Sequence, residues 1–189
     1  MKKLRKVAVY CGSRTGLDNQ HSLLATELGR SIAEYDTALV YGAGGIGLMK
    51  MVADAVLAEN GEVIGVITQN LILKEVQHTK LTKTLVVNTM HERKKTMFDL
   101  ADAFIILPGG FGTLDEFFEI LTWRILGLHQ KPIILVESRN YWQNLINLIN
   151  QIIQEGFADK TVNSQYSIAY NISEIFEIIS DTHVINVSN

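Results

Sequence analysis

Short apolar runs alternate along the chain with longer segments in which apolar residues recur at helical spacing. The short runs are rich in β-branched residues and predict strands at Lys6–Tyr10, Thr37–Tyr41, Val63–Ile67, Thr84–Val87, Ala103–Leu107 and Lys131–Val136. The longer segments predict helices at Gln20–Glu34, Gly47–Glu59, His91–Ala101, Thr113–Leu126, Tyr141–Glu155 and Ser173–Ile179. Strands joined by helical crossovers pair in parallel, so the pattern predicts one parallel sheet flanked by helices.

This alternation is typical of an α/β, Rossmann-like, doubly wound fold. The chain has 189 residues, the length of one domain, and we expect residues 1–189 to form a single nucleotide-binding domain. We interpret Gln69–Lys83, a long mixed connection, as a loop over the site. Ligands of such sheets bind outside the carboxyl ends of the strands, so the segments that follow the strands hold the candidate chemistry.

Composition narrows the class of ligand and the compartment. The formal net charge of -3 argues against a nucleic-acid partner, because a phosphate backbone requires clustered Lys and Arg. No uncharged apolar stretch reaches the ~18–20 residues of a membrane-spanning helix, and the N-terminal apolar run is too short for a signal peptide. Cys11 is the only cysteine, which favours the cytoplasm.

A glycine-rich segment follows the fifth predicted strand. It reads Pro108-Gly109-Gly110-Phe111-Gly112-Thr113-Leu114-Asp115-Glu116 and leaves free backbone N–H groups at the start of a helix, where a phosphate binds favourably. The alternative is structural, because Thr113 and Glu116 also fit the capping box T-x-x-E. A capping box does not require the glycines or the nearby Asp115 and Glu119, and several carboxylates beside an anion site indicate acid–base chemistry.

A second glycine-rich segment, Gly42–Gly47, matches the dinucleotide fingerprint G-x-G-x-x-G. A nicotinamide cofactor would also require an acidic residue at the end of the next strand, but Thr68 and Gln69 stand there. The match falls on the second predicted strand, whereas the fingerprint belongs to the first βα turn. We therefore interpret this loop as a wall of a mononucleotide pocket.

Charged and small residues follow two further strands. In Met90–Lys95, Arg93 is the candidate to hold a phosphate or a leaving base through paired hydrogen bonds, with Lys94 assisting; the alternative is a solvated helix face. The turn Cys11–Ser13 offers a hydroxyl and room for a ligand, or is a simple turn. Cys11 has no assigned base and is disfavoured as a nucleophile, and the histidines lack metal-ligand spacing.

Together these motifs resemble the Lonely Guy family, the cytokinin-activating phosphoribohydrolases. The family hallmarks are P-G-G-x-G-T-x-x-E and M-h-x-R-K, and this chain has PGGFGTLDE at 108–116 and MHERK at 90–94. The resemblance continues through CGSR at 11–14, YGAGGIGLM at 41–49 and LTWRILGLHQKP at 121–132. It therefore spans most of the chain as far as the sixth predicted strand.

The resemblance implies a homodimeric enzyme that acts on N6-substituted AMP or on AMP itself, with water as the nucleophile and without a cofactor. Arg93 and Glu116 match the catalytic pair. Substrate contacts are implied for Ser13, Gly44, Gly45, Glu75, Met90, Lys94, Gly109, Gly110, Phe111, Gly112, Thr113 and Thr122. Some members carry the label lysine decarboxylase, but no residue pattern here indicates pyridoxal phosphate chemistry.

Two departures from the family pattern bear on base preference, because Ala43 and Lys50 replace glycines of Y-G-G-G-x-x-G-L-M-G.

Two other functions remain open at this point. The pocket could sense a nucleotide without cleaving it, or the glycine fingerprint could serve a nicotinamide-dependent oxidoreductase. Release of free base from AMP distinguishes the first from a hydrolase, and a cofactor titration tests the second.

Overall fold

A computed structural model describes residues 6–72 and 77–185, with the side chains of 182–185 excepted. Its strands form one sheet of seven in the order β4-β3-β2-β1-β5-β6-β7, and every pairing is parallel. The strands are β1 (Lys6–Tyr10), β2 (Ala38–Tyr41), β3 (Val63–Thr68), β4 (Lys83–Val87), β5 (Ala103–Ile106), β6 (Ile133–Val136) and β7 (Ser167–Ala169). The strand order reverses between β1 and β5, which confirms the doubly wound fold.

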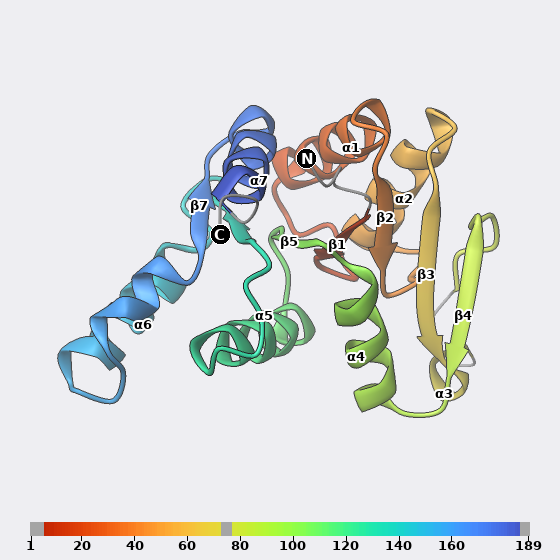
Figure 1. Cartoon of the computed structure of the whole chain (residues 1–189). Helices are drawn as coiled ribbons and strands as arrows, with labels where there is room; N and C mark the ends of the chain where they lie inside the picture. Colours follow the sequence, from red (N-terminus) through yellow and green to blue (C-terminus); the bar gives the residue numbers. More distant parts are fainter. Residues whose placement is uncertain (1–5, 73–76, 186–189) are drawn as a thin grey trace.

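Helices cover both faces of the sheet (Figure 1). One core cluster contains residues of α1 (Asn19–Glu34), α2 (Gly47–Ala58) and α7 (Ile172–Ile185). The other contains residues of α4 (Met90–Leu100), α5 (Phe111–Ile125) and α6 (Gln143–Gln154). Two short helices, α3 (Gln69–Ile72) and the 3₁₀ helix η1 (Lys160–Ser164), complete the described elements. None of the described helices is both long enough and apolar enough to cross a bilayer.

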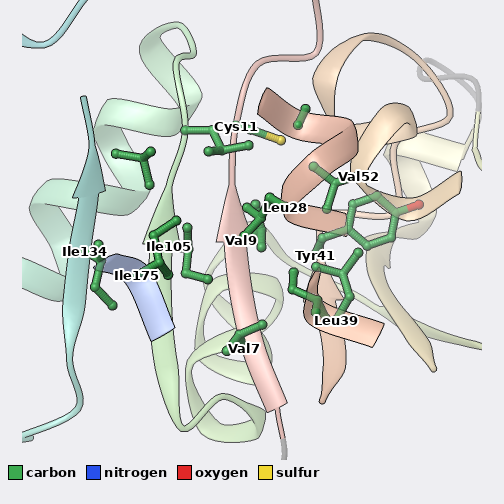
Figure 2. Close-up of a cluster of buried hydrophobic side chains, with 14 of the residues drawn as sticks. Val7, Val9, Cys11, Leu28, Leu39, Tyr41, Val52, Ile105, Ile134 and Ile175 are labelled. Carbon is green, nitrogen blue, oxygen red and sulfur yellow. The ribbon is translucent and has the colours of Figure 1, made fainter. Parts of the chain in front are cut away.

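The central strands are buried on both faces, as expected for a parallel sheet between helical layers. Alternate residues of β1 contribute to different clusters: Val7 and Val9 pack on the α1 side, whereas Ala8 and Tyr10 pack on the α5 side. Figure 2 shows the first cluster, in which side chains from several strands meet those of α1, α2 and α7. The loops at the carboxyl ends of these strands therefore rest on a rigid base.

The structure differs from the sequence predictions at four elements, one of which is the unpredicted 3₁₀ helix η1. The short strand β7 and the one-turn helix α3 were not predicted, and α3 lies inside the connection that we interpreted as a loop. Helix α5 begins at Phe111 rather than at Thr113, and its N-cap is Gly110. Thr113 is therefore a helical residue, and the capping-box alternative for Thr113 and Glu116 is wrong.

Candidate active site

A cavity of about 180 Å³, called here the reaction cavity, lies at the switch point between β1 and β5. The loop after β1, the start of α5 and one residue each of α2 and α4 contribute to it. Its lining residues are Cys11, Ser13, Met49, Arg93, Gly110, Phe111, Gly112, Thr113 and Glu116. Ligands of doubly wound folds bind at this point of the sheet.

Arg93 is a buried cation with a fixed orientation. Its side chain comes from α4, and the residue is 7% exposed. The Nε atom donates to the Val66 carbonyl and Nη2 donates to the Gly42 carbonyl, each at 3.0 Å. A Cβ on residue 42 would lie 2.0 Å from Arg93 Nη2, so glycine is required there. Since a guanidinium has five N–H bonds, three remain for a ligand in the reaction cavity.

Glu116 faces the same cavity from the second turn of α5 and is partly exposed. Burial raises the pKa of its carboxyl to about 7; Asp115 and Glu119 raise it further, whereas Arg93 and Lys94 lower it. A carboxyl group with a pKa near neutrality can accept and return a proton under ordinary conditions. The reaction cavity therefore combines a permanent cation with a carboxyl group suited to proton transfer.

The start of α5 presents main-chain groups to the cavity without a side-chain cap. A Cβ on Gly109 would lie 2.1 Å from Thr113 Oγ1, whereas a Cβ on Gly110 or Gly112 would meet no atom within 4 Å. The Tyr141 hydroxyl donates to the Gly109 carbonyl at 2.5 Å and holds this loop from the β6 side. The first amides of a 15-residue helix are thus open to an anion.

Lys94 forms an ion-pair triad with two carboxylates of α5. Its Nζ atom lies 3.1 Å from Asp115 Oδ2 and 3.0 Å from Glu119 Oε1, and its side chain is 12% exposed. Burial lowers the pKa of Lys94, but the Glu119 and Asp115 carboxylates outweigh this and raise it. Lys94 is not among the residues that line the reaction cavity, and it joins α4 to α5 beside Glu116.

The charged segment at the start of α4 also contains a true helix cap. The Thr89 hydroxyl accepts a hydrogen bond from the Glu92 amide at 3.1 Å, and the Glu92 carboxylate accepts one from the Asn88 amide at 2.8 Å. Lys95 pairs with Asp99 one turn later at 2.6 Å. The solvated-face interpretation therefore holds for Glu92 and Lys95, but not for buried Arg93.

The structure brings together one part of the predicted site. Arg93 and Glu116 share the reaction cavity with the predicted contacts Ser13, Gly110, Phe111, Gly112 and Thr113. Gly109 borders an adjoining cavity.

The other predicted contacts lie elsewhere. Gly44, Gly45, Met90 and Thr122 line neither of these two cavities: Gly44 pairs with Gln77 in an isolated bridge, and Met90 and Thr122 are exposed. Glu75 lies outside the described residues.

Met49 lines the reaction cavity but was not predicted to do so, because its position depends on how the start of α2 meets the loop after β1, where the Leu48 and Met49 amides donate to the Gly12 carbonyl. Cys11 also lines it, and burial, followed by the charge of Glu116, raises the pKa of its thiol strongly. The thiol is therefore protonated and a poor nucleophile. Among the described residues, no group of three or more His, Cys, Asp or Glu could hold a metal.

The two departures from the glycine-rich pattern do not alter the cavity walls. Ala43 has φ 59° and is fully buried, so its backbone follows the left-handed path that glycine favours. Lys50 is exposed and pairs with Asp54 on α2. Neither side chain lines the reaction cavity or the adjoining cavity.

The sequence is similar to curated phosphoribohydrolases. The family described as "Possible lysine decarboxylase" matches residues 49–179. A cytokinin riboside 5′-monophosphate phosphoribohydrolase of Rhodococcoides fascians is 41% identical over 169 residues, with 89% of this chain and 85% of that protein covered. A protein of the same name from Arabidopsis thaliana is 36% identical over 179 residues, with 95% and 84% covered.

Solved structures with low sequence identity share the fold. The molybdenum cofactor binding protein of Rippkaea orientalis superimposes with a TM-score of 0.71 at 21% identity, over 96% of this chain and 98% of that one. The molybdenum cofactor carrier protein of Chlamydomonas reinhardtii gives 0.71 at 14% identity, over 96% and 99%. At such identities the likeness concerns the fold alone. The relatives above 30% identity, which align along most of their length, show that the chain belongs to the Lonely Guy family of cytokinin riboside 5′-monophosphate phosphoribohydrolases.

Proposed function

We propose that this protein hydrolyses the N-glycosidic bond of adenosine 5′-monophosphate or its N6-substituted forms, releasing the free base and ribose 5-phosphate. The names of the relatives support this reaction class. The observation that carries the proposal is the shared lining of the reaction cavity, where Arg93 and Glu116 lie beside the uncapped start of α5. A cation, a carboxyl group and an anion site in one cavity are the parts that ribotide cleavage requires.

The 5′-phosphate binds at the first amides of α5, where the helix dipole and the free N–H groups favour a negative charge. The Thr113 hydroxyl and the Ser13 hydroxyl are available as further donors in the same cavity. Binding of this remote group fixes the ribose and orients its anomeric carbon toward Glu116.

In the chemical step the bond between the anomeric carbon and the base nitrogen breaks, and its electron pair leaves with the base. The Glu116 carboxylate stabilises the oxocarbenium-like sugar and accepts a proton as water adds to the anomeric carbon. Arg93 stabilises the negative charge that develops on the departing base through N–H bonds not used by Val66 and Gly42. Glu116 then passes the proton that it accepted from water to the base nitrogen, so neutral base and ribose 5-phosphate are the products and the carboxylate is regenerated. No cofactor enters this scheme.

Replacing Glu116 by Gln tests the role of the carboxylate. We expect turnover to fall about 10²–10⁴-fold, the usual contribution of such a group, while nucleotide affinity changes little because the shape is retained. Release of base is measured by chromatography, and Glu27→Gln, an exposed change on α1, is the control. Undiminished base release by Glu116→Gln would refute the role, and wild type that binds AMP without releasing base would indicate a sensor.

We further propose a homodimer in the cytoplasm. Ile125, Leu126 and Leu128 are exposed at the end of α5, and clustered exposed apolar side chains mark interfaces. Thr122 lies one turn before this group and is also exposed, so a dimer formed through this surface would bring Thr122 close to the partner chain. Light scattering should give twice the chain mass for wild type and a lower mass for Leu126→Glu.

The proposed cytoplasmic compartment rests on Cys11, whose buried free thiol fits a reducing environment.

A further inference from the structure

A second cavity of about 360 Å³, called here the adjoining cavity, lies next to the reaction cavity. Ser13, Gly110 and Phe111 line both cavities, so the first amides of α5 stand at their junction. A ligand bound at these amides by one phosphate could therefore extend into either cavity. The mechanism proposed above uses only the reaction cavity.

Three polar side chains of the adjoining cavity suit an anion, and the rest of its wall is mainly apolar, with Leu48, Pro108 and Phe111 among the lining residues. Arg14, Thr15 and His21 line it, and no Asp or Glu is among its described lining residues. Arg14 is exposed and forms no ion pair within the described part of the chain. The nearby Asp18 carboxylate already accepts from the Gln20 amide and pairs with Arg139 at 3.2 Å. A guanidinium beside open amides is well suited to a phosphate group.

His21 provides an independent indication that the adjoining cavity binds a polar ligand. The residue is 8% exposed, and its Nδ1 atom is buried without a hydrogen-bond partner. Its ring packs edge-on against Tyr141 at 5.5 Å, and the Tyr141 hydroxyl holds the Gly109 carbonyl. Buried polar atoms of proteins nearly always have a hydrogen-bond partner. The unpaired nitrogen therefore indicates that a ligand supplies the partner. His21 lines the adjoining cavity together with the residues that the two cavities share.

We propose that the adjoining cavity is a second phosphate subsite, which receives the outer phosphate of a nucleoside 5′-diphosphate while the inner phosphate occupies the start of α5. This inference rests on the proposed function for the position of the inner phosphate. Arg14 holds the outer phosphate, and the hydroxyls of Ser13 and Thr15 line its path. Nucleoside diphosphates then compete with the monophosphate substrate for one site, so their concentration regulates turnover.

Calorimetric titration with inorganic phosphate and pyrophosphate tests the subsite without requiring activity. In wild type we expect pyrophosphate to bind at least about tenfold more tightly than phosphate, since a second charge-assisted contact forms. Arg14→Gln should weaken pyrophosphate binding about tenfold and phosphate binding less than about threefold. The matched control Arg30→Gln removes an exposed arginine from α1 and should change neither, which corrects for net charge.

Two results would overturn the subsite: equal weakening of both ligands by Arg14→Gln, or no weakening of either. Repeating the titrations with AMP and ADP in Glu116→Gln extends the test to nucleotides. ADP should show the same dependence on Arg14 as pyrophosphate, and dependence confined to pyrophosphate would overturn the assignment to nucleoside diphosphates. If the chain released no base from any monophosphate, the proposed function would fail, but the titrations would still decide on the subsite.

Discussion

At the scale of single residues, the protonation of Glu116 should control the rate. Burial raises the pKa of this carboxyl to about 7, and the proposed mechanism needs its ionised form. We therefore expect kcat to rise with pH through about 7 and then to level off. A pH profile at saturating substrate measures this, because saturation separates kcat from the ionisation of the free nucleotide. A rate that is flat between pH 5.5 and 8.5 would contradict the assignment.

The triad of Lys94, Asp115 and Glu119 should set where that transition occurs. Lys94 lowers the pKa of Glu116, whereas the two carboxylates raise it, so Lys94→Met should move the kcat transition to higher pH. Asp115→Asn should move it to lower pH. If Lys94 instead contacts the nucleotide directly, Lys94→Met would raise KM and leave the transition in place. The two profiles therefore separate a positioning role from a binding role.

At the scale of elements, the first turn of α5 leaves an open space beside its glycines. A ligand can enter this space, and a side chain in place of a glycine would fill it. A Cβ on Gly112 would meet no protein atom within 4 Å, so Gly112→Ala should fold and gain about 0.5 kcal/mol of helix stability. Because Gly112 lines the reaction cavity, the methyl group should raise KM about tenfold, which is equivalent to about 1.4 kcal/mol. Denaturant unfolding and initial rates measure the two effects.

Gly127, just after the other end of α5, is the matched control for Gly112→Ala. It also has open space around a Cβ, but its φ is +73°. Gly127→Ala should therefore cost about 1 kcal/mol of stability while KM stays unchanged. An unchanged KM in Gly112→Ala would argue against phosphate binding at this turn.

Helices and strands could mostly be predicted, because their patterns are local in the sequence. Contacts between elements that are far apart in the sequence could not. Six of the seven strands were predicted from their apolar runs, but β7 has only three residues, two of them partly exposed. The start of α5 was placed two residues late, because Phe111-Gly112 does not look helical by propensity. Motifs beside strand ends predicted Arg93 and Glu116, which do line one cavity, whereas Met49 ends the quoted motif at 41–49 and reaches that cavity only through the packing of α2.

At the scale of the whole molecule, Glu116 should make stability depend on pH. An unfolded glutamate has a pKa of about 4.3, and the folded value is raised to about 7, so the native state binds this proton more tightly. The stabilisation from protonated Glu116 is complete below about pH 4.3 and is lost as the pH rises from there through about 7, a loss of about 3–4 kcal/mol.

Glu116→Gln cannot lose a proton, so its melting temperature should exceed that of wild type at pH 8 by about 10 °C. At pH 5 the advantage should be small, because wild-type Glu116 is then largely protonated. Scanning calorimetry at both pH values measures the difference, and Glu27→Gln provides the baseline. An advantage of equal size at pH 5 and pH 8 would show that Glu116 titrates alike in the folded and unfolded states.

The hydrogen bonds that anchor Arg93 make its orientation depend on complete folding of the chain. Its guanidinium joins the loop after β2 to Val66 within β3, although the residue itself belongs to the helix that follows β4. Three separate stretches must dock before this group acquires its working orientation. A nascent or half-denatured polypeptide therefore lacks the aligned cation, and we expect immature or damaged copies to leave nucleotides intact.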